Sequence, residues 1–517
     1  MIRRLPQALV SAVVFLSCAA PRAQEVPRVP RTTVASRVAC RVHAIVRAPA
    51  EGMVEVAPPQ LLGRTGPGAA AIELPPHWSW WLEPEAPEAF TAQDLADLVT
   101  DVADASPPAL SLAGCARLRD VDLEPLRRLD GLRQLDLSGC RGLTGAALAL
   151  LHDLPALAWL RTDGSRIDPD AVAVRGTRRA DDAVRAALAE HSLVGVAAAI
   201  VVDGRLAHAR GYGFSDREAE LSVSPTETSF RWASISKTVT AVAALQLVER
   251  DELTLEADVR TLVPEFPDKG AVLTIRQLLC HQAGIVHYRN GPVVRTERTY
   301  DVEHPFVDPV LALDAFKESP LVCPPGSRYS YSTHGYILLG AAVQRAGAEP
   351  YQEQVHERIA LPLGMTTFRP DYEWEVIPGR TRGYRRDGEA IRRSRDVDVS
   401  WKLAGGGFTS CVVDLARFGQ GLLGGTLLRR ETQAAMFTAQ ATADGKRTRY
   451  GLGIQLGVLP GGVAWFGHSG AQEKTRTMLL LVPSRQVGVA VMCNSEWADS
   501  LALARALAAA ALETSAR

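Results

Sequence analysis

The stretch FRWASISKTVT, residues 230–240, decides how this chain is interpreted, because it places Ser234 and Lys237 in the pattern Ser-x-x-Lys. After it, alanine, leucine and valine recur at helical spacing to about residue 250, and no glycine or proline interrupts them. The pattern predicts a helix that begins near Ser234. Positions three apart lie on neighbouring turns of one helix face, so we expect the two side chains to touch.

Such a pair suits nucleophilic catalysis. A serine hydroxyl becomes a good nucleophile when a neighbouring base takes its proton, and a partly desolvated lysine with a lowered pKa can be that base. The start of a helix adds free backbone N–H groups where a negative oxygen would develop. Because Ser-x-x-Lys also arises by chance in long chains, the prediction depends on partners elsewhere in the sequence.

Composition limits the possible functions. The length of 517 residues predicts two or more domains. Hydrophobic residues make up 47% and charged residues 22%, as in globular proteins, and a net charge of −1 argues against a nucleic-acid partner. The eight cysteines include no C-x-x-C pattern and predict no disulfide framework. His281 and His287 lack metal-ligand spacing, so we expect ordinary loop histidines, no metal and no cofactor.

The N-terminal segment, residues 1–23, has the order of a secretory signal. Two arginines precede an apolar run, residues 8–16, and small residues follow, so cleavage is expected after Ala20 or Ala23. An alternative is lipoprotein processing, because the sequence ending at Cys18 loosely resembles a bacterial lipobox. Either route exports the protein to the periplasm or the cell exterior. The apolar run is short for a membrane span, and no later stretch is a candidate.

A repeat with a period of 25 residues organises part of the N-terminal region, residues 28–174. The segment LSLAGC, residues 110–115, recurs as LDLSGC, residues 135–140, and in eroded form as LRTDGS, residues 160–165. This period is typical of leucine-rich repeats, in which each unit adds a short strand and a helix to a stack.

Residues 90–172 resemble the cysteine-containing subclass of leucine-rich repeats. The resemblance implies that Cys115 and Cys140 are buried and are not ligands. Repeats of this kind carry no chemistry themselves. We expect the module to bind a protein partner or to dock onto the next domain.

The second domain is expected from residue 178 to residue 517, after a polar linker at residues 175–181 and with a helix from about residue 180. A continuous apolar run, residues 194–202, ends at Asp203-Gly204, which is a hairpin signal, and residues 205–212 return as the paired strand. Further distinctive blocks follow in order. They are LTIRQLLCHQAG (273–284), PGSRYSYS (325–332), AGGGF (404–408), DLARF (414–418) and GHSG (467–470).

Together with the Ser234 block, these segments resemble the serine β-lactamase and penicillin-binding-protein-like superfamily in its class C-like branch. The resemblance covers roughly residues 180–510. It implies an α/β (α+β) fold in which an antiparallel sheet is flanked by helices, with an all-helical insert between Ser234 and His468.

The family's Tyr-x-Asn motif falls on YST, residues 331–333. The resemblance implies that Tyr331 transfers protons beside the nucleophile, with a phenol pKa depressed by Lys237. Thr333 stands where the family has asparagine, which weakens the case for β-lactam chemistry more than the case for acyl transfer. The literal match YRN, residues 288–290, lacks the preceding Pro-Gly turn, and we reject it.

The family's Lys-Thr-Gly strand is HSG in this chain. By resemblance, His468 polarises the site or fixes a substrate carboxylate, and Ser469 hydrogen-bonds toward Tyr331. Gly470 lets the backbone approach the substrate. The N–H group of Ala471, with that of the nucleophile, is expected to form the oxyanion hole.

The sequence therefore predicts a serine hydrolase that forms an acyl-enzyme at Ser234, with Lys237 and Tyr331 as the base pair. Its expected substrate is a small molecule or peptide with an ester, amide or lactam carbonyl, and cell-wall fragments are among the candidates. Esterase, D-amino-acid peptidase and β-lactamase-related activities all fit. The alternative is a non-catalytic binding protein with a degenerate hydrolase domain and partner-binding repeats, which the intact Ser, Lys and Tyr disfavour.

Overall fold

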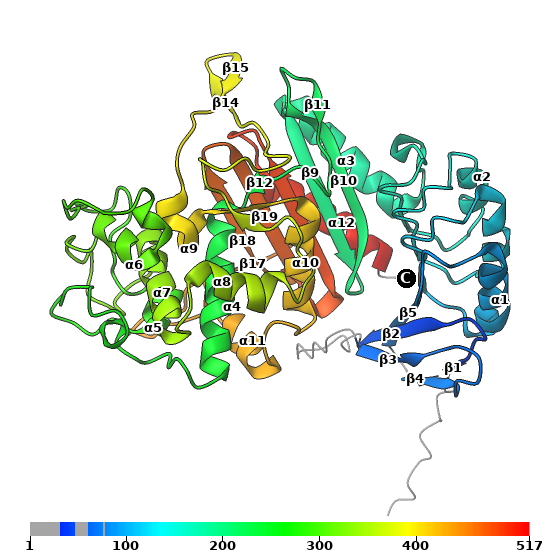
Figure 1. Ribbon diagram of the computed structural model, residues 1–517, viewed down its shortest axis with the longest axis horizontal. Coiled ribbons are helices and arrows are strands. Elements are labelled where there is room, and N and C mark those ends of the chain that lie inside the picture. The colour runs from blue at the N-terminus through cyan, green and yellow to red at the C-terminus, as the bar shows by residue number, and fades with distance from the viewer. Residues whose placement is uncertain (1–31, 47–59, 76–77, 516–517) are drawn as a thin grey trace, which may run out of the picture.

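The structure is a computed structural model that describes residues 32–46, 60–75 and 78–515 (Figure 1). The expected export signal, with Cys18, lies outside these residues. Within them, no helix has the length and apolar character needed to cross a membrane.

A seven-stranded sheet forms the centre of the C-terminal unit, and every neighbouring pair in it is antiparallel. The predicted hairpin is present: Asp203 and Gly204 have positive φ angles of 51° and 71°, as a tight two-residue turn requires. In spatial order the strands are β11 (Leu221–Ser222), β10 (Arg205–Asp216), β9 (Gly195–Val202), β20 (Val487–Cys493), β19 (Thr475–Val482), β18 (Ala464–Gln472) and β17 (Gln455–Val458).

Strand β9 explains why its sequence is apolar without alternation. It is buried along its whole length, and its two faces belong to two different cores because successive side chains of a strand point in opposite directions. One core takes Ala197, Ala199 and Val201, and the other takes Val196, Ala198, Ile200 and Val202.

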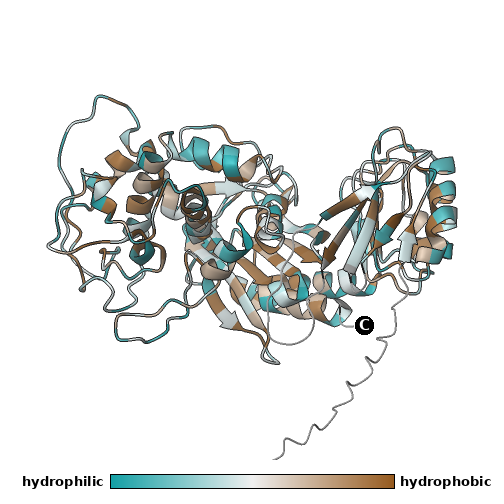
Figure 2. Ribbon diagram, turned by 90° about the horizontal axis from the view of Figure 1, so that it is seen from below, coloured by the Kyte–Doolittle hydropathy of each residue, from teal (hydrophilic) through white to brown (hydrophobic). Residues whose placement is uncertain are grey.

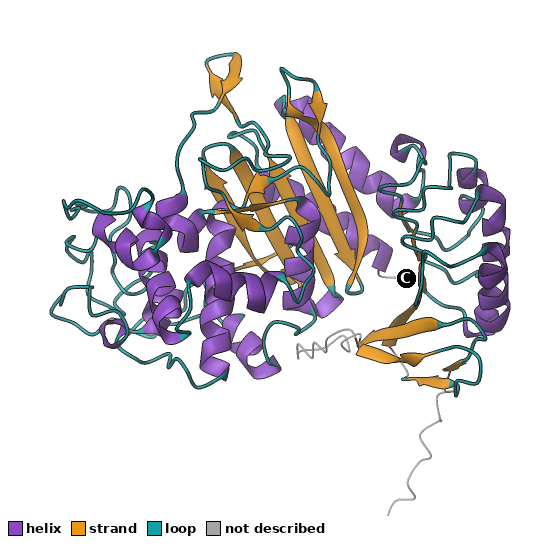
Figure 3. Ribbon diagram, in the orientation of Figure 1, coloured by secondary structure: helices purple, strands orange, loops and turns teal. Residues whose placement is uncertain are grey.

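Helices cover both faces of this sheet (Figure 3). Helices α3 (Arg175–His191) and α12 (Ser500–Ser515) pack on one face, and α10 (Val412–Leu423) packs on the other. Helix α4 (Ser236–Glu249) is the predicted helix after Ser234, and it is buried on all sides over most of its length. Figure 2 shows how hydrophobic residues concentrate on the strands and inner helices of this unit.

Helices are the main regular elements between Ser234 and His468, but strands and long loops are present too, which corrects the expected all-helical insert. The further helices of this segment are α5 (Ile275–Leu279), α6 (Pro309–Ala312), α7 (Thr333–Ala346), α8 (Tyr351–Val355), α9 (Leu403–Gly406) and α11 (Arg430–Met436). Strands β13 (Arg369–Pro370) and β16 (Phe408–Ser410) form a small sheet with β12 (Phe230–Arg231), and β14 (Tyr384–Asp387) pairs with β15 (Ala390–Arg393).

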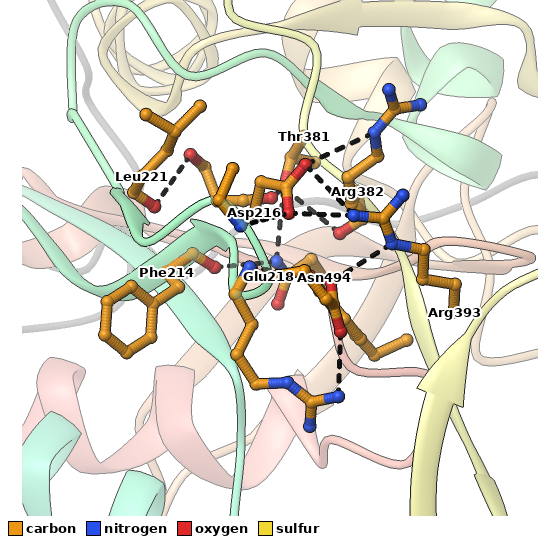
Figure 4. A network of polar contacts seen from close by, with 12 residues as sticks. Phe214, Asp216, Glu218, Leu221, Thr381, Arg382, Arg393 and Asn494 are labelled. Atoms are coloured by element: carbon orange, nitrogen blue, oxygen red, sulfur yellow. Dashed lines mark hydrogen bonds and ion pairs between the residues drawn. The ribbon is translucent and has the colours of Figure 1, made fainter.

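A polar network fastens the β14–β15 hairpin to the end of the large sheet (Figure 4). The Arg393 guanidinium lies 3.1 Å from Asp216 Oδ1 and 3.1 Å from Glu218 Oε2. Below it, Asn494 Nδ2 donates to the carbonyl oxygen of Phe214 at 2.9 Å. The insert is thus anchored at both the helical core and the sheet end.

The N-terminal unit contains a six-stranded mixed sheet. Its strands, in spatial order, are β3 (Gln60–Arg64), β2 (Cys40–Val46), β5 (Trp78–Pro84), β6 (Ala109–Ser111), β7 (Gln134–Asp136) and β8 (Trp159–Arg161). The first three pair antiparallel and the last four pair parallel. Strands β1 (Thr32–Val34) and β4 (Ile72–Leu74) form a separate pair, and α1 (Ala92–Val102), a 3-10 helix (Asp120–Arg128) and α2 (Ala147–Leu151) complete the unit.

The 25-residue sequence period recurs in space. Leu110, Leu135 and Leu160 are register partners on β6, β7 and β8. A glycine follows each strand in the left-handed region, with φ of 76° at Gly114, 70° at Gly139 and 73° at Gly164. A Cβ atom at the second of these would lie 3.5 Å from the backbone of the first, so the three turns stack closely.

The repeat cysteines also behave as expected. Cys115 and Cys140 are buried free thiols, and the Cys140 thiol contacts the carbonyl oxygen of Leu112 at 3.0 Å. One strand and one helical segment per period fit a solenoid. The assignment of these units to leucine-rich repeats stays a prediction.

The two units share a buried contact. Trp159 on β8 is 1% exposed and packs into the core that lies between the large sheet and helices α3 and α12. Its indole N–H donates to Thr514 Oγ1 at 3.0 Å. Beside it, Gln134 Nε2 donates to the carbonyl oxygen of Val202 at 3.3 Å. The repeats therefore dock against the end of the β9–β10 hairpin.

The expected linker at residues 175–181 is instead the first part of α3. Thr177 is buried there, and its hydroxyl accepts a hydrogen bond from the Leu160 N–H at 3.1 Å. Of the polar residues that suggest a linker, Arg175, Arg178 and Arg179 lie on the outer face of this helix, whereas Thr177 and Asp181 face inward. The chain thus passes between its two units through a helix that both units contact.

Candidate active site

Ser234 and Lys237 meet as their spacing predicts. Ser234 lies in a single 3-10 turn, Ala233–Ile235, that leads directly into α4. Lys237 Nζ lies 3.2 Å from Ser234 Oγ and donates to the carbonyl oxygen of Gly405 at 2.6 Å. The Gly405 carbonyl therefore orients the amine toward the hydroxyl, a contact that links α4 to α9.

The environment of Lys237 favours an uncharged amine. The side chain is fully buried, and this loss of solvent lowers its pKa well below the usual lysine value. The positive charge of nearby Lys402 lowers the pKa further. A neutral amine has a lone pair, so Lys237 is able to accept the proton of the Ser234 hydroxyl.

The backbone around Ser234 is closely held. Ala233 has a φ of 47°, a left-handed conformation that is uncommon outside glycine. Strand β18 passes directly beside it: a Cβ atom at Gly470 would lie 2.4 Å from the Trp232 carbonyl oxygen and 2.1 Å from Thr477 Oγ1. Gly470 is therefore needed for the approach of the strand to the nucleophile's own backbone.

Tyr331 lies beside the pair. Lys237 Nζ is 5.0 Å from the centroid of its ring, and Tyr331 and Ser234 line the same cavity. Loss of solvent raises the pKa of Tyr331 above its usual value, which corrects the expected depression. Tyr331 therefore keeps its proton more firmly than a free phenol, whereas burial shifts the neighbouring Lys237 amine toward its neutral form.

Thr333 and the rejected YRN match occupy different places. Thr333 opens α7 on the wall of the same cavity, and its N–H donates to His287 Nδ1 at 3.2 Å. Tyr288 also lines the cavity, whereas Asn290 Oδ1 accepts from the backbone N–H of His287 at 2.6 Å and does not reach it. Tyr331 is the tyrosine at the nucleophile.

His468 differs from its expected role. It is 1% exposed, and burial lowers its pKa to about 3. Nδ1 lies 2.7 Å from the Ser469 carbonyl oxygen, which only accepts hydrogen bonds, so Nδ1 carries the proton and Nε2 accepts from the Tyr450 hydroxyl at 2.9 Å. A neutral imidazole with both nitrogens engaged does not supply a cation for a substrate carboxylate.

The remaining residues of this strand face the cavity. Ser469 lines the cavity, but its hydroxyl and its N–H both donate to Gln455 Oε1 on the neighbouring strand, at 3.4 Å and 3.2 Å, instead of hydrogen-bonding toward Tyr331. Ala471 lines the cavity together with Ser234. Ser234 lies in the first turn of a helix, where N–H groups lack intrahelical partners, so its N–H is suited to an oxyanion.

Residues 180–513 match the family described as Beta-lactamase. The chain belongs to this family. Its relatives include the mitochondrial serine beta-lactamase-like protein LACTB of Mus musculus, with 30% identity over 51% of this chain and 60% of that protein. Esterase EstB of Burkholderia gladioli is 34% identical over 38% of this chain and 53% of its own length. This chain thus spans less than two thirds of either relative.

A solved structure supports the fold. The D-amino acid amidase from Ochrobactrum anthropi aligns with a TM-score of 0.54 and 19% identity, over 65% of this chain and 99% of that one. The aligned share of this chain is close in size to the matched segment, residues 180–513. The beta-lactamase fold therefore accounts for the C-terminal unit.

Three histidines, His281, His287 and His334, lie at the segment that carries Tyr331, residues 329–334. The ring of His281 lies 4.3 Å from that of Tyr331, and its Nδ1 accepts from the Ser332 N–H at 3.2 Å. Burial lowers the pKa values of His287 and His334 to about 4. No group of three potential ligands in the described residues is placed to hold a metal ion. These histidines thus position the loop as neutral side chains.

The site opens into a cavity of about 510 Å³. The sequence analysis did not place six of its lining side chains in the site: His287, Tyr288, Lys402, Gln455, Gln472 and Glu473. A signal for one of them was present, because Lys402 directly precedes the AGGGF block. Gln455 and Gln472 lie at the ends of strands β17 and β18, and the other three lie in turns or loops; their approach to Ser234 depends on the tertiary fold.

Proposed function

We propose that this protein is a serine hydrolase of the class C-like type that forms an acyl-enzyme at Ser234. The observation that carries the proposal is the fully buried Lys237 amine, which lies 3.2 Å from the Ser234 hydroxyl and whose pKa is lowered by burial. A serine without such a base is a poor nucleophile, and a lysine without catalytic use is seldom fully buried.

The proposed reaction uses three side chains in turn. Lys237 takes the proton of Ser234 as Oγ attacks the substrate carbonyl carbon. The N–H groups of Ser234 and Ala471 receive the negative carbonyl oxygen. Collapse of this intermediate expels the leaving group, which takes a proton from Tyr331 or Lys237. Water then repeats the sequence on the acyl-enzyme and frees Ser234.

We propose that esters and D-amino-acid peptides or amides, including cell-wall fragments, are better substrates than β-lactams. Thr333 offers a hydroxyl where the family motif has an amide, and His468 is neutral where that strand commonly has a lysine. The name of its relative EstB supports an esterase. All residues that line the catalytic cavity belong to the C-terminal unit. We therefore propose that the docked repeats stabilise that unit or bind a protein partner.

Export also remains a proposal, through signal cleavage or lipidation at Cys18. It rests on the residue order of the first 23 positions. Microscopy of the tagged full-length chain in a bacterial host, compared with a chain lacking residues 1–23, tests it. Retention of both proteins in the cytoplasm would contradict export.

The central experiment is labelling of the full chain with a fluorophosphonate probe. We expect labelling of the wild type and loss of it in Ser234→Ala. Ser236→Ala is a matched control, because this neighbouring serine is buried and contacts the Phe408 N–H rather than the cavity. An unlabelled wild type, or a labelled Ser234→Ala, would contradict the assignment and favour a non-catalytic binding protein.

The substrate ranking has its own test. Steady-state rates of the wild type on a p-nitrophenyl ester and on a chromogenic cephalosporin are compared at equal enzyme concentration. We expect a larger kcat/KM for the ester. Faster turnover of the cephalosporin would reverse the ranking.

A further inference from the structure

Lys402 is a buried cation at the catalytic cavity that the reaction does not use. It ends a 3-10 turn, Ser400–Lys402, directly before α9, and its side chain is 7% exposed. It lines the same cavity as Ser234. Among the described residues its ammonium has no hydrogen-bond or ion-pair partner, and it faces the rings of Tyr288 at 5.8 Å and Trp401 at 5.7 Å.

The lack of a partner sets Lys402 apart from comparable lysines of this chain. Lys317 pairs with Asp314 at 2.7 Å, and Lys474 pairs with Asp396 at 2.5 Å. Folded proteins rarely bury a lysine unless it is paired, because removing an ammonium from water is costly. An unpaired ammonium aimed into a cavity is therefore matched to something that enters the cavity.

The cation persists at neutral pH. Burial lowers the pKa of Lys402 only to about 8, so the protonated form dominates at pH 7. The other basic groups around Ser234 hold a proton less readily: burial lowers the pKa of Lys237 well below its usual value and that of His468 to about 3. Glu473 also lines the cavity and raises the pKa of Lys402, but the two do not form an ion pair.

We propose that Lys402 is an anion subsite of the catalytic cavity and binds a carboxylate carried by the substrate. The inference rests on the proposed function, in which Ser234 is the nucleophile. A substrate carboxylate restores the electrostatic partner that Lys402 lacks, and the two flanking rings keep water from competing for it. Lys402 thus binds the substrate carboxylate, a role that the sequence analysis assigned to His468. The preferred substrates are therefore monoanionic esters or amides.

The first test compares two esters of equal length and leaving group, mono-p-nitrophenyl adipate and p-nitrophenyl hexanoate. We expect Lys402→Gln to lower kcat/KM for the adipate at least 10-fold more than for the hexanoate, mainly through KM. Lys402→Arg should retain part of the preference. Any change in the basicity of Lys237 affects both esters alike, so the ratio isolates the carboxylate.

Two controls accompany the esters. Lys446→Gln removes an exposed lysine that does not line this cavity, and we expect an unchanged ratio. Glu473→Gln removes the acidic neighbour, and we expect the adipate to be bound no worse. Thermal melts of all variants show whether each remains folded. A ratio that Lys402→Gln leaves within twofold of the wild type would overturn the subsite.

A binding measurement separates this proposal from the proposed function. Benzoate, with benzamide as the neutral control, is titrated calorimetrically into Ser234→Ala and into the double variant with Lys402→Gln. We expect benzoate to bind the first protein at least 10-fold more tightly than the second, whether or not the wild type hydrolyses any ester. Equal benzoate affinities would refute the subsite even if Ser234 is the nucleophile.

Discussion

Gly470→Ala provides the sharpest test of the site geometry. The new methyl group would lie 2.4 Å from the Trp232 carbonyl oxygen, whereas ordinary contact begins at 3.4 Å, a deficit of 1.0 Å. Neither Trp232 nor Thr477 is free to withdraw. The Trp232 N–H donates to the Phe408 carbonyl at 2.8 Å, and Thr477 is fully buried on β19. Strand β18 must therefore move away from the turn that holds Ser234.

The expected magnitude has two parts. Overpacking of this kind costs about 1–3 kcal/mol of the free energy of unfolding. A displacement of about 1 Å in a catalytic group lowers the rate by about 10²-fold. Because the displaced strand carries Ala471 past Ser234, we expect the loss in kcat to exceed what partial unfolding would explain.

The assay combines ester hydrolysis, fluorophosphonate labelling and a thermal melt of the full chain. Gly488→Ala is the matched control: it adds a methyl group on β20, where the nearest atom is the end of the Leu423 side chain at 3.3 Å. We expect that control to keep its activity. If Gly470→Ala retains more than a third of the wild-type kcat with an unchanged melt, the inferred contact between β18 and the nucleophile is wrong.

Three further changes test other parts of the structure. Lys237→Arg replaces the amine with a side chain that stays charged, so we expect labelling and hydrolysis to fall at least 10³-fold. In the wild type we expect kcat/KM to decline at acidic pH, because Lys237 becomes protonated there. An active arginine variant would contradict a neutral base. Tyr331→Phe should lower kcat about 10²- to 10⁴-fold with an unchanged melt, and near-normal kcat would remove Tyr331 from proton transfer. Trp159→Ala should lower the free energy of unfolding, measured in urea, by about 3–5 kcal/mol, with a normal kcat per folded molecule. A fragment of residues 178–517 lacks the same contact and should also be less stable than the full chain. An equally stable fragment would show that the two units are independent.

Local patterns in the sequence predicted much of the fold. The apolar run of β9 and the Asp203-Gly204 turn specified the first hairpin, because a continuous apolar run and a turn preference are properties of neighbouring residues. The 25-residue period likewise appears as the parallel register of β6, β7 and β8. Spacing along one helix also sufficed to bring Ser234 and Lys237 together.

The connection between the two units was harder to predict. The polar residues at 175–181 form the start of α3: its arginines face solvent, whereas Thr177 and Asp181 are buried and hydrogen-bonded to other segments. Trp159 gave no sign from sequence that it would enter the core of the other unit. Both outcomes depend on which surfaces meet after the chain has folded, and a short window of sequence does not contain that information.

The chemistry of the site depended most on tertiary structure. The sequence identified Ser234, Lys237 and Tyr331 as the residues of the site, through their motifs alone. The structure decided that Tyr331 keeps its proton, that His468 is occupied by Tyr450, and that the Gly405 carbonyl holds the amine. A pKa or a hydrogen bond is set by solvent exclusion and by partners from segments far apart in the chain, and these are brought together only when the whole domain folds.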